Sequence, residues 1–202
     1  MHILVEHSLE SSWDSLYTFF AQFHPDVALE RTFFDFINLG EMLEEYQNAT
    51  ALLYLSKIQF EEISKNYHCK VIKEERICLY VTKDSFLQER KSISLNSIRN
   101  MKILVYTSEK ALSAMLNAFP VDALKNNGNQ IVFNLTSTLL KSLSEVEDTI
   151  LFAPEGIHFD AQLFPFVPVK LKEKILLYQC LVTKNSEIPD LLIKALQTLK
   201  TT

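Results

Sequence analysis

Short apolar runs alternate with amphipathic stretches between residues 1 and 55. Residues 1–6 and 51–55 are nearly continuous apolar runs, a pattern typical of strands covered on both faces. Residues 27–34 alternate in polarity and predict another strand. Large apolar side chains at helical spacing predict helices over 13–23 and 39–47. The order strand, helix, strand, helix, strand predicts a parallel sheet with helices on its faces.

This pattern is interrupted after residue 55 and then returns. Two strand-like segments, 71–72 and 77–82, follow each other with no long helix between them, and 94–99 predicts a short helix. The elements predicted after them are strands at 102–106, 130–134, 149–153, 167–171 and 175–183, and helices at 109–118, 137–143 and 189–199. The chain therefore contains a second α/β unit of similar size.

No stretch of the sequence has the composition of a flexible linker. The Gly/Asn-rich piece at 125–130 predicts a turn inside the second unit. Two α/β units without a flexible joint predict a two-lobed body with a cleft. The strands at 71–82 and 175–183 are the predicted crossing points between the lobes.

Composition and charge exclude several classes of protein. The chain is 48% hydrophobic and 22% charged, which is ordinary for a globular protein. Its formal net charge of −5 and scattered basic residues argue against nucleic-acid binding by this chain alone. No apolar run reaches the roughly 18 residues of a membrane span, and no basic region precedes the first apolar patch, so we expect neither a membrane partner nor a signal peptide.

The cysteines and histidines do not predict a metal site or a nucleophilic enzyme. The three cysteines form no CxxC motif, and no Cys/His group has zinc spacing. Cys78 and Cys180 lie inside apolar runs, where a free thiol behaves as a small hydrophobe. This usage favours a reducing, cytoplasmic location. With three glycines, no phosphate-binding loop and no G-x-S-x-G turn, we expect no nucleotide cofactor and no covalent catalysis.

An ordered series of segments resembles the effector-binding half of LysR-type transcriptional regulators. FFAQFHPDVALE is similar to the family's stretch in which a helix ends at F…YPdV and leads into an alternating strand. VIKEERICLYVTKDSFLQERKSISLNSIRNMKILVY resembles the run l..e.l.lvv..dHPLa....isl.dL.d.p.i. The further matching segments lie at 33–56, 152–157 and 166–200. The resemblance covers almost the whole chain.

This resemblance implies a fold class, α/β with two Rossmann-like subdomains joined by two crossing strands, which is the type 2 periplasmic-binding-protein fold. It implies one regulatory subdomain at 1–79 with 173–202 and another at 80–172. It also implies a homodimer or tetramer formed through the Trp13–Phe23 helix and the Val27–Phe34 strand. The family's winged helix-turn-helix, which contacts DNA, and its linker helix belong before residue 1. We expect that they have been removed, the alternative being a stand-alone effector domain.

The predicted effector site lies at the carboxyl ends of the strands, where helix N-termini attract anions. Most candidates are hydroxyl, amide or acidic residues between a strand end and a helix start. Two others are added: an aromatic residue that would form a wall of the pocket, and a threonine at the end of the first crossing strand. The full set of candidates is Ser8, Glu10, Ser11, Ser12, Phe34, Thr82, Thr107, Asn134, Thr136 and Ser137. By resemblance, the loops after the first strand and after residue 133 are the main contacts.

Other interpretations of these residues stay open. A Ser or Thr at a helix start is also an N-cap, worth about 1 kcal/mol of stability. Glu10 would repel a carboxylate ligand, although it could bind an amine. The leading hypothesis is a small-molecule sensing domain that is not an enzyme and that takes an anionic effector. The alternative is a stand-alone solute-binding protein or an enzyme on the same scaffold.

Overall fold

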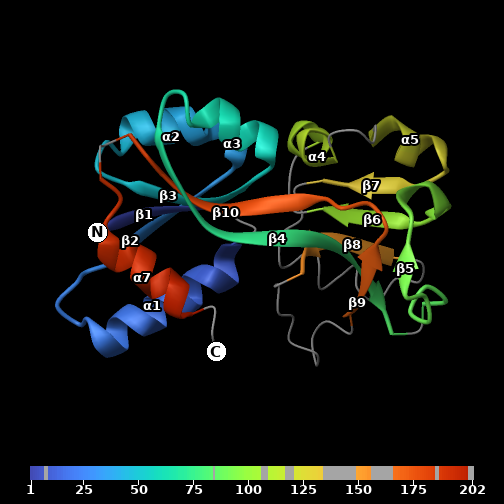
Figure 1. Cartoon of the computed structure of the whole chain (residues 1–202), viewed down its shortest axis with the longest axis horizontal. Coiled ribbons are helices and arrows are strands. Elements are labelled where there is room, and N and C mark those ends of the chain that lie inside the picture. Colours follow the sequence, from blue (N-terminus) through green and yellow to red (C-terminus); the bar gives the residue numbers. More distant parts are fainter. Residues whose placement is uncertain are drawn as a thin grey trace. The chain divides into compact units, whose positions relative to one another are not determined.

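The chain folds into two units, and extended segments of the chain run from one unit to the other (Figure 1). The computed structural model describes residues 1–6, 9–83, 85–105, 109–116, 121–133, 149–155, 166–184 and 187–199. Unit 1 contains Met1–Glu74 and Tyr178–Thr202, and unit 2 contains Glu75–Leu177. The chain therefore changes unit after residues 74 and 177, where the resemblance implied changes after residues 79 and 172.

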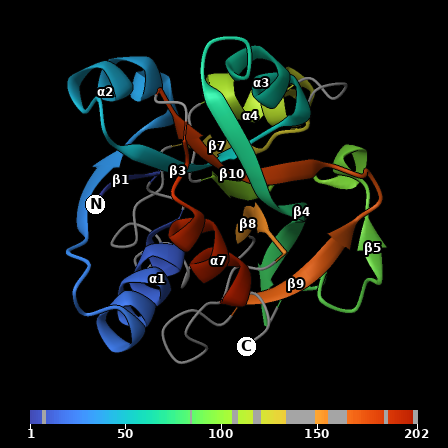
Figure 2. The same ribbon diagram turned by 60° about the vertical axis from the view of Figure 1, so that its left-hand side comes forward.

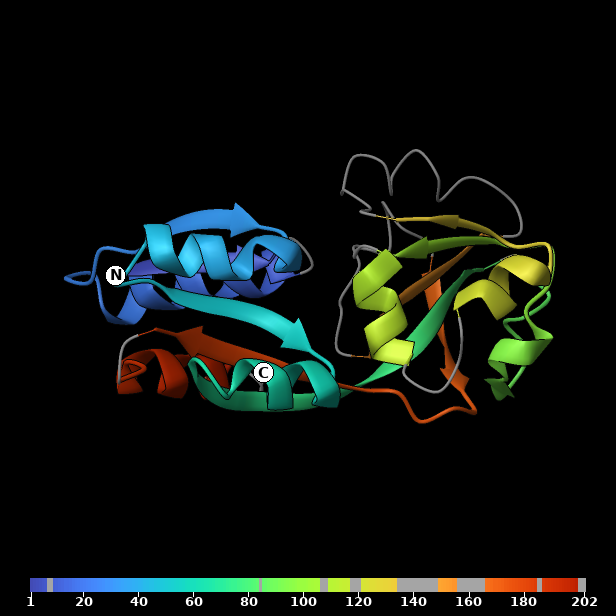
Figure 3. The same cartoon turned by 90° about the horizontal axis from the view of Figure 1, so that it is seen from above.

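Unit 1 is built on a mixed sheet. Strands β2 (Glu30–Phe34), β1 (His2–Glu6) and β3 (Thr50–Leu55) are parallel neighbours in that order. Strand β10 (Leu176–Thr183) pairs antiparallel with β3, and β4 (His68–Thr82) lies beside β10 (Figure 3). The predicted parallel core is thus extended by the two strands that lead to unit 2.

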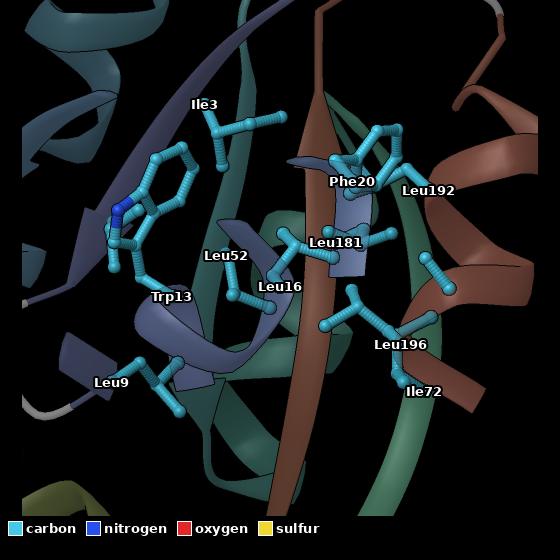
Figure 4. Close-up of a cluster of buried hydrophobic side chains, with 12 residues drawn as sticks. Ile3, Leu9, Trp13, Leu16, Phe20, Leu52, Ile72, Leu181, Leu192 and Leu196 are labelled. Atoms are coloured by element: carbon cyan, nitrogen blue, oxygen red, sulfur yellow. The ribbon is translucent and has the colours of Figure 1, made fainter. Parts of the chain in front are cut away.

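Helices cover both faces of this sheet, which explains the continuous apolar runs in β1 and β3. Helices α1 (Glu10–Phe23) and α7 (Asp190–Thr198) cover one face, and α2 (Leu39–Glu45) and α3 (Lys57–Ile63) cover the other (Figure 1). The cluster under α1 and α7 is drawn in Figure 4. Its buried members include Ile3, Trp13, Leu16, Phe20, Leu181 and Leu192.

Unit 2 has its own sheet, in which the second half of β4 is central. Strands β8 (Thr149–Pro154) and β9 (Phe166–Leu171) both pair antiparallel with β4. The remaining strands form parallel pairs. Strand β6 (Lys102–Val105) pairs with β8, β7 (Gln130–Val132) pairs with β6, and β5 (Ser92–Ile93) pairs with β9. Among the described helices of unit 2 are η3 (Leu95–Ser97), α4 (Glu109–Leu116) and α5 (Val121–Asn126).

Most predicted elements are present, with corrections at their ends. Helix α1 begins at Glu10, three residues before the predicted start, and β2 begins at Glu30, three residues after it. The predicted strands at 71–72 and 77–82 are parts of one strand, β4, which runs uninterrupted in Figure 2. The short helix expected at 94–99 is the 3-10 turn η3.

The sequence prediction missed η2 (Phe36–Asn38), α3, α5 and β5. Helix α3 has a capping box: the Ser56 hydroxyl accepts from the backbone N–H of Gln59, and the Gln59 side chain accepts from the Ser56 backbone N–H. The helix predicted at 137–143 lies outside the described residues. Within the described part, no helix has both the length and the apolarity needed to cross a bilayer.

Candidate functional site

The carboxyl edge of the parallel strands is the first place to look for a site, because ligands of open α/β sheets bind there. In unit 1, β1 ends at Glu6, β3 ends at Leu55, and α1 begins at Glu10, a short distance along the chain from β1. These ends bring the first turn of α1 to the edge of the sheet.

Glu6 is a buried carboxylate at this edge. Its side chain is 8% exposed, and its Oε2 atom accepts a hydrogen bond from the backbone N–H of Tyr54 at 2.9 Å. The carboxylate therefore meets a donor of β3 at the point where the ladder between β1 and β3 ends. An acid at the end of a buried apolar strand is held there by hydrogen bonding, because an unpaired charge would be costly.

Gln179 enters the same region from β10. It lies opposite Tyr54 in the antiparallel ladder between β10 and β3, one position from the pair formed by Tyr178 and Leu55. Its side chain is 6% exposed, and its Nε2 atom lies 3.5 Å from the hydroxyl oxygen of Ser12 in α1. Ser12 and Gln179 thus bring α1 and β10 together beside the carboxyl end of β3.

The N-terminus of α1 can attract acceptors. Its N-cap residue is Leu9, which offers no side chain that could accept a hydrogen bond from the first turn. A helix of 14 residues leaves its first N–H groups without helical partners, and the helix dipole places partial positive charge there. This end of α1 lies at the edge to which Ser12 and Gln179 belong, and the helix dipole favours a negatively charged group there.

The predicted site residues fall in three groups. Ser12 is half-buried beside Gln179, as described. Phe34 is 3% exposed and packs in the core between the sheet and α2, and Thr82 is a half-buried residue of unit 2 at the end of β4, opposite Phe166. The residues outside the described part are Ser8, Thr107, Asn134, Thr136 and Ser137, and the side chains of Glu10 and Ser11 are outside it too.

Sequence reasoning missed Glu6 and Gln179. A signal existed for both, since each is a strongly polar residue in an otherwise apolar strand, and a buried polar residue is more informative than an exposed apolar one. The search for hydroxyl groups between strands and helices passed over residues inside the strands themselves.

In unit 2, Tyr80 fixes the carboxyl end of β8. Its hydroxyl lies 2.9 Å from the backbone oxygen of Pro154 and 3.0 Å from that of Glu155, so it can donate to either. Burial raises the pKa of the Tyr80 phenol, with further contributions from Cys78 and the acidic Glu75 and Glu155. The phenol therefore stays protonated and acts as a donor at neutral pH.

The described residues contain no group of three or more His, Cys, Asp or Glu side chains that could hold a metal ion. Cys78 and Cys180 are buried free thiols, and Cys69 is half-buried. Burial raises the pKa of the thiols of all three, which makes the thiolate form scarce.

Solved structures share this architecture, whereas sequence comparison finds no counterpart. No protein-family model matches the chain, and no curated protein matches its sequence. The regulatory domain of CcmR from Synechocystis PCC6803, in complex with 2-PG, matches with a TM-score of 0.71 at 10% identity, over 98% of this chain and 96% of that one. Reduced OxyR matches with a TM-score of 0.73 at 14% identity, over 98% and 94%.

A third matching structure is of a protein that is named as a LysR family regulator. HinK, a LysR family transcriptional regulator from Pseudomonas aeruginosa, matches with a TM-score of 0.73 at 11% identity, over 100% of this chain and 71% of that one. The chain has the fold of a LysR-type regulatory domain. The predicted α/β class with two crossing strands is thus confirmed. In this LysR-type regulatory fold, Gln179 and Ser12 belong to unit 1 and Thr82 and Tyr80 to unit 2.

Proposed function

We propose that the chain is the effector-sensing domain of a LysR-type transcriptional regulator, working in the cytoplasm. The observation that carries this proposal is the match to the CcmR regulatory domain over 98% of this chain and 96% of that one. That domain was solved in complex with 2-PG, so a regulatory domain of this fold accepts a small molecule. The effector, which we expect to be anionic, binds where the strand ends and helix N-termini provide donors.

The ligand acts on an equilibrium between arrangements of the regulator. A small molecule shifts such an equilibrium only by binding one arrangement more tightly than another. The sensing domain itself would perform no covalent chemistry. It would influence DNA binding through a winged helix-turn-helix domain elsewhere in the regulator, because the acidic net charge of −5 does not favour direct contact with DNA.

The proposed site includes the candidates that lie outside the described residues. Ser8, Ser11 and Thr107 belong to it, as do Asn134, Thr136 and Ser137, because each is expected at a helix start beside a strand end. Ser12 and Thr82 are supported further by their positions, the first in the opening turn of α1 and the second at the end of β4.

We also propose that the domain forms homodimers through α1 and β2. Tyr17 and Phe23 of α1 are 53% and 58% exposed, which is unusual for large aromatic side chains on one helix. Strand β2 is at one edge of the unit 1 sheet and has one neighbour, β1, among the described strands. Two exposed aromatic side chains on a helix of the same unit as an open strand edge support a self-association surface.

A thermal-shift screen tests the sensing function. Carboxylates, amino acids, sugar acids and 2-PG are added separately to the purified domain. At a hundred times its Kd, an effector adds about 2.7 kcal/mol to the free energy of unfolding, which corresponds to a Tm increase on the order of 5–10 °C for a chain of this size. A screen in which no compound raises the Tm contradicts the proposal.

The alternative functions make different predictions for the same screen. A solute-binding protein would also respond to a ligand, but it would not alter the DNA affinity of a protein that carries the winged helix domain. An enzyme would consume the stabilising compound over time. Measuring DNA affinity with and without the compound, and recovering the compound unchanged, distinguishes a sensor from both.

A further inference from the structure

A groove runs along α1 in unit 1, on the face of the sheet that α1 shares with α7 (Figure 1). Its volume is about 970 Å³. It is lined by residues of α1 between Asp14 and Phe23, by the cap residue His24, and by Thr198 and Leu199 at the end of α7. None of the predicted effector-site residues lines it, so the groove is separate from that site.

The lining residues of α1 form two neighbouring rows with different chemistry. Residues four apart lie above one another on a helix, so Asp14, Thr18 and Gln22 form one row. Their side chains offer a carboxylate, a hydroxyl and an amide oxygen. The second row contains the rings of Phe19 and Phe23, whose centroids are 5.0 Å apart. The helix rises about 13 Å between the first and the last of these residues, which makes the groove long enough for an extended molecule.

The electrostatics of the groove favour a cation. Helix α1 ends at Phe23 and α7 ends at Thr198, and the carboxyl end of a helix carries partial negative charge. Neither helix has a basic residue in its last turn. Asp14 adds a full negative charge, and no Lys or Arg is among the described residues that line the groove. The Thr18 hydroxyl donates to the backbone oxygen of Asp14 at 2.8 Å, so it can only accept from a ligand.

Arg31 approaches Asp14 without occupying it fully. Its Nη1 atom lies 3.5 Å from Oδ1 of Asp14, and the two side chains are 39% and 69% exposed, which makes this a weak ion pair. The Arg31 guanidinium also lies over the rings of Trp13 and Phe33, at 5.7 and 4.6 Å from their centroids. These rings hold Arg31 independently of Asp14, so the carboxylate stays available to a second cation.

We propose that this groove binds an aliphatic polyamine, a molecule with ammonium groups joined by methylene chains. One ammonium group donates to the row that begins with Asp14 and Thr18. Another lies at the carboxyl end of α1, where the helix dipole and the face of Phe23 attract it. The methylene chain between them packs against Phe19 and Leu199, so the groove satisfies both the charged and the apolar parts of one ligand.

Titration of the ¹⁵N-labelled protein with spermidine tests this binding by nuclear magnetic resonance. At pH 8 histidine side chains are normally neutral and aliphatic amines are protonated. The backbone amide signals of Thr18, Gln22 and Phe23 should shift and saturate with a Kd on the order of 0.1–1 mM at low salt. The Kd should rise with ionic strength.

Helix α5 of unit 2 is the internal control, because it carries the exposed Asp122 and lies outside the groove. Its signals report non-specific attraction of spermidine to an acidic protein. A saturable shift in α1 with α5 unmoved supports the inference. Signals of α1 that do not move, or that move only in proportion to those of α5, overturn it.

The length of the groove gives a second test. In the series diaminobutane, diaminohexane and diaminooctane the Kd should fall, because the second ammonium group comes within reach of the other end of the groove. Octylamine has one ammonium group and should bind at least threefold more weakly than diaminooctane. Equal Kd values for octylamine and diaminooctane would rule out a site for two charges.

Substitutions of exposed residues on α1 locate the site. Asp14→Asn should weaken spermidine binding about three- to tenfold, because an ion pair is lost. Phe23→Ser should weaken it about two- to fivefold, because an aromatic face is lost. Tyr17→Ser is the matched control, since Tyr17 is 53% exposed, close to the 58% of Phe23, but does not line the groove. It should leave the Kd unchanged, although Tyr17 and Phe23 both belong to the proposed dimer surface.

The opposite pattern of affinities contradicts the inference. Asp14→Asn and Phe23→Ser variants that bind spermidine as tightly as the natural protein would remove these residues from the site. A Tyr17→Ser variant that loses as much affinity as Phe23→Ser would assign the effect to the aromatic surface in general instead of the groove.

Lys200 is the chain's own ammonium group nearest in sequence to Leu199, and it lies outside the described residues. Lys200→Gln tests whether this lysine fills the groove. An unchanged Kd for spermidine supports a site for a free polyamine. A variant that binds spermidine more than tenfold more tightly assigns the groove to Lys200 and overturns the inference. The screen for the sensing function is read separately, because the effector-site residues do not line this groove.

Discussion

The carboxylate of Glu173 accepts a hydrogen bond from the hydroxyl of Ser94 at 2.6 Å, across 79 positions of sequence. Both of its oxygens also lie within 3.2 Å of the backbone nitrogen of Leu95. Ser94 is the N-cap of η3 but makes no capping bond of its own, so Glu173 caps that turn from a distance. Glu173→Gln should therefore lower the free energy of unfolding by about 1 kcal/mol in urea denaturation at pH 7.

The effect of Glu173 should depend on pH. Burial alone would raise the pKa of this carboxyl, but the bonds from Ser94 and Leu95 and the nearby Lys172 outweigh it and hold the pKa below its ordinary value. The stabilisation is complete above the unfolded pKa of about 4.3 and is lost as the pH falls through the lower folded value. The difference between the natural protein and Glu173→Gln should thus shrink below about pH 4, and a constant difference would contradict this account.

Gly128 has a left-handed backbone with φ of +78°, and a Cβ at this position would collide with Oδ1 of Asn100. Gly128→Ala should cost about 1–3 kcal/mol of unfolding free energy, because both the conformation and the contact are unfavourable.

Gly40 is the matched control for this substitution. It is exposed in α2, and a Cβ there would meet the Tyr67 hydroxyl at an ordinary 3.6 Å. Gly40→Ala should stabilise the protein by up to about 1 kcal/mol, since alanine favours the helix. Equal changes of stability in the two variants would show that backbone conformation does not govern either site.

Asn129 joins three segments of unit 2 through its bonds to Ile98, Leu124 and Met101. Asn129→Ala leaves one N–H group and two carbonyl groups without these partners and should cost about 2–4 kcal/mol. Asn129→Asp should be at least as damaging near pH 7, because a carboxylate would face the carbonyl oxygens of Ile98 and Leu124. Chemical denaturation measures both, and a change below about 0.5 kcal/mol in Asn129→Ala would refute the bonding pattern.

The proposed dimer should depend on the exposed aromatic side chains of α1, Tyr17 and Phe23. The double substitution Tyr17→Glu with Phe23→Glu should shift the domain from dimer to monomer in sedimentation equilibrium, because charge at an apolar interface is costly. Phe86→Glu is the control, since Phe86 is 63% exposed and lies in unit 2. A natural protein that is monomeric at micromolar concentration, or a dimer that survives the double substitution, would rule out this surface.

The strands were predictable where burial on both faces made the apolar pattern continuous. Strands β1, β3 and β8 lie within one residue of their predicted limits for this reason. Strand β4 was split in the prediction by the charged residues 73–76. The chain nevertheless stays extended there, because β4 has strand neighbours in both units.

The helix α3 and the site residues in the strands were missed for a different reason. The apolar positions of α3, Ile58, Phe60 and Ile63, do not follow a clear helical spacing, and its capping box at Ser56 and Gln59 was the better signal. Gln179 is placed by the pairing of β10 with β3. That pairing joins parts of the chain more than a hundred residues apart, so local sequence patterns could not predict it.

Unit 2 is one uninterrupted segment of chain, whereas unit 1 consists of two segments with unit 2 between them. The core beneath α1 takes Leu181, Leu192 and Leu196 from the second of these segments. During synthesis on the ribosome, the residues of unit 2 are therefore all present before that core can close. The apolar face of α1 must wait for the arrival of β10 and α7, and in that interval the nascent chain is most exposed to aggregation and to chaperone binding.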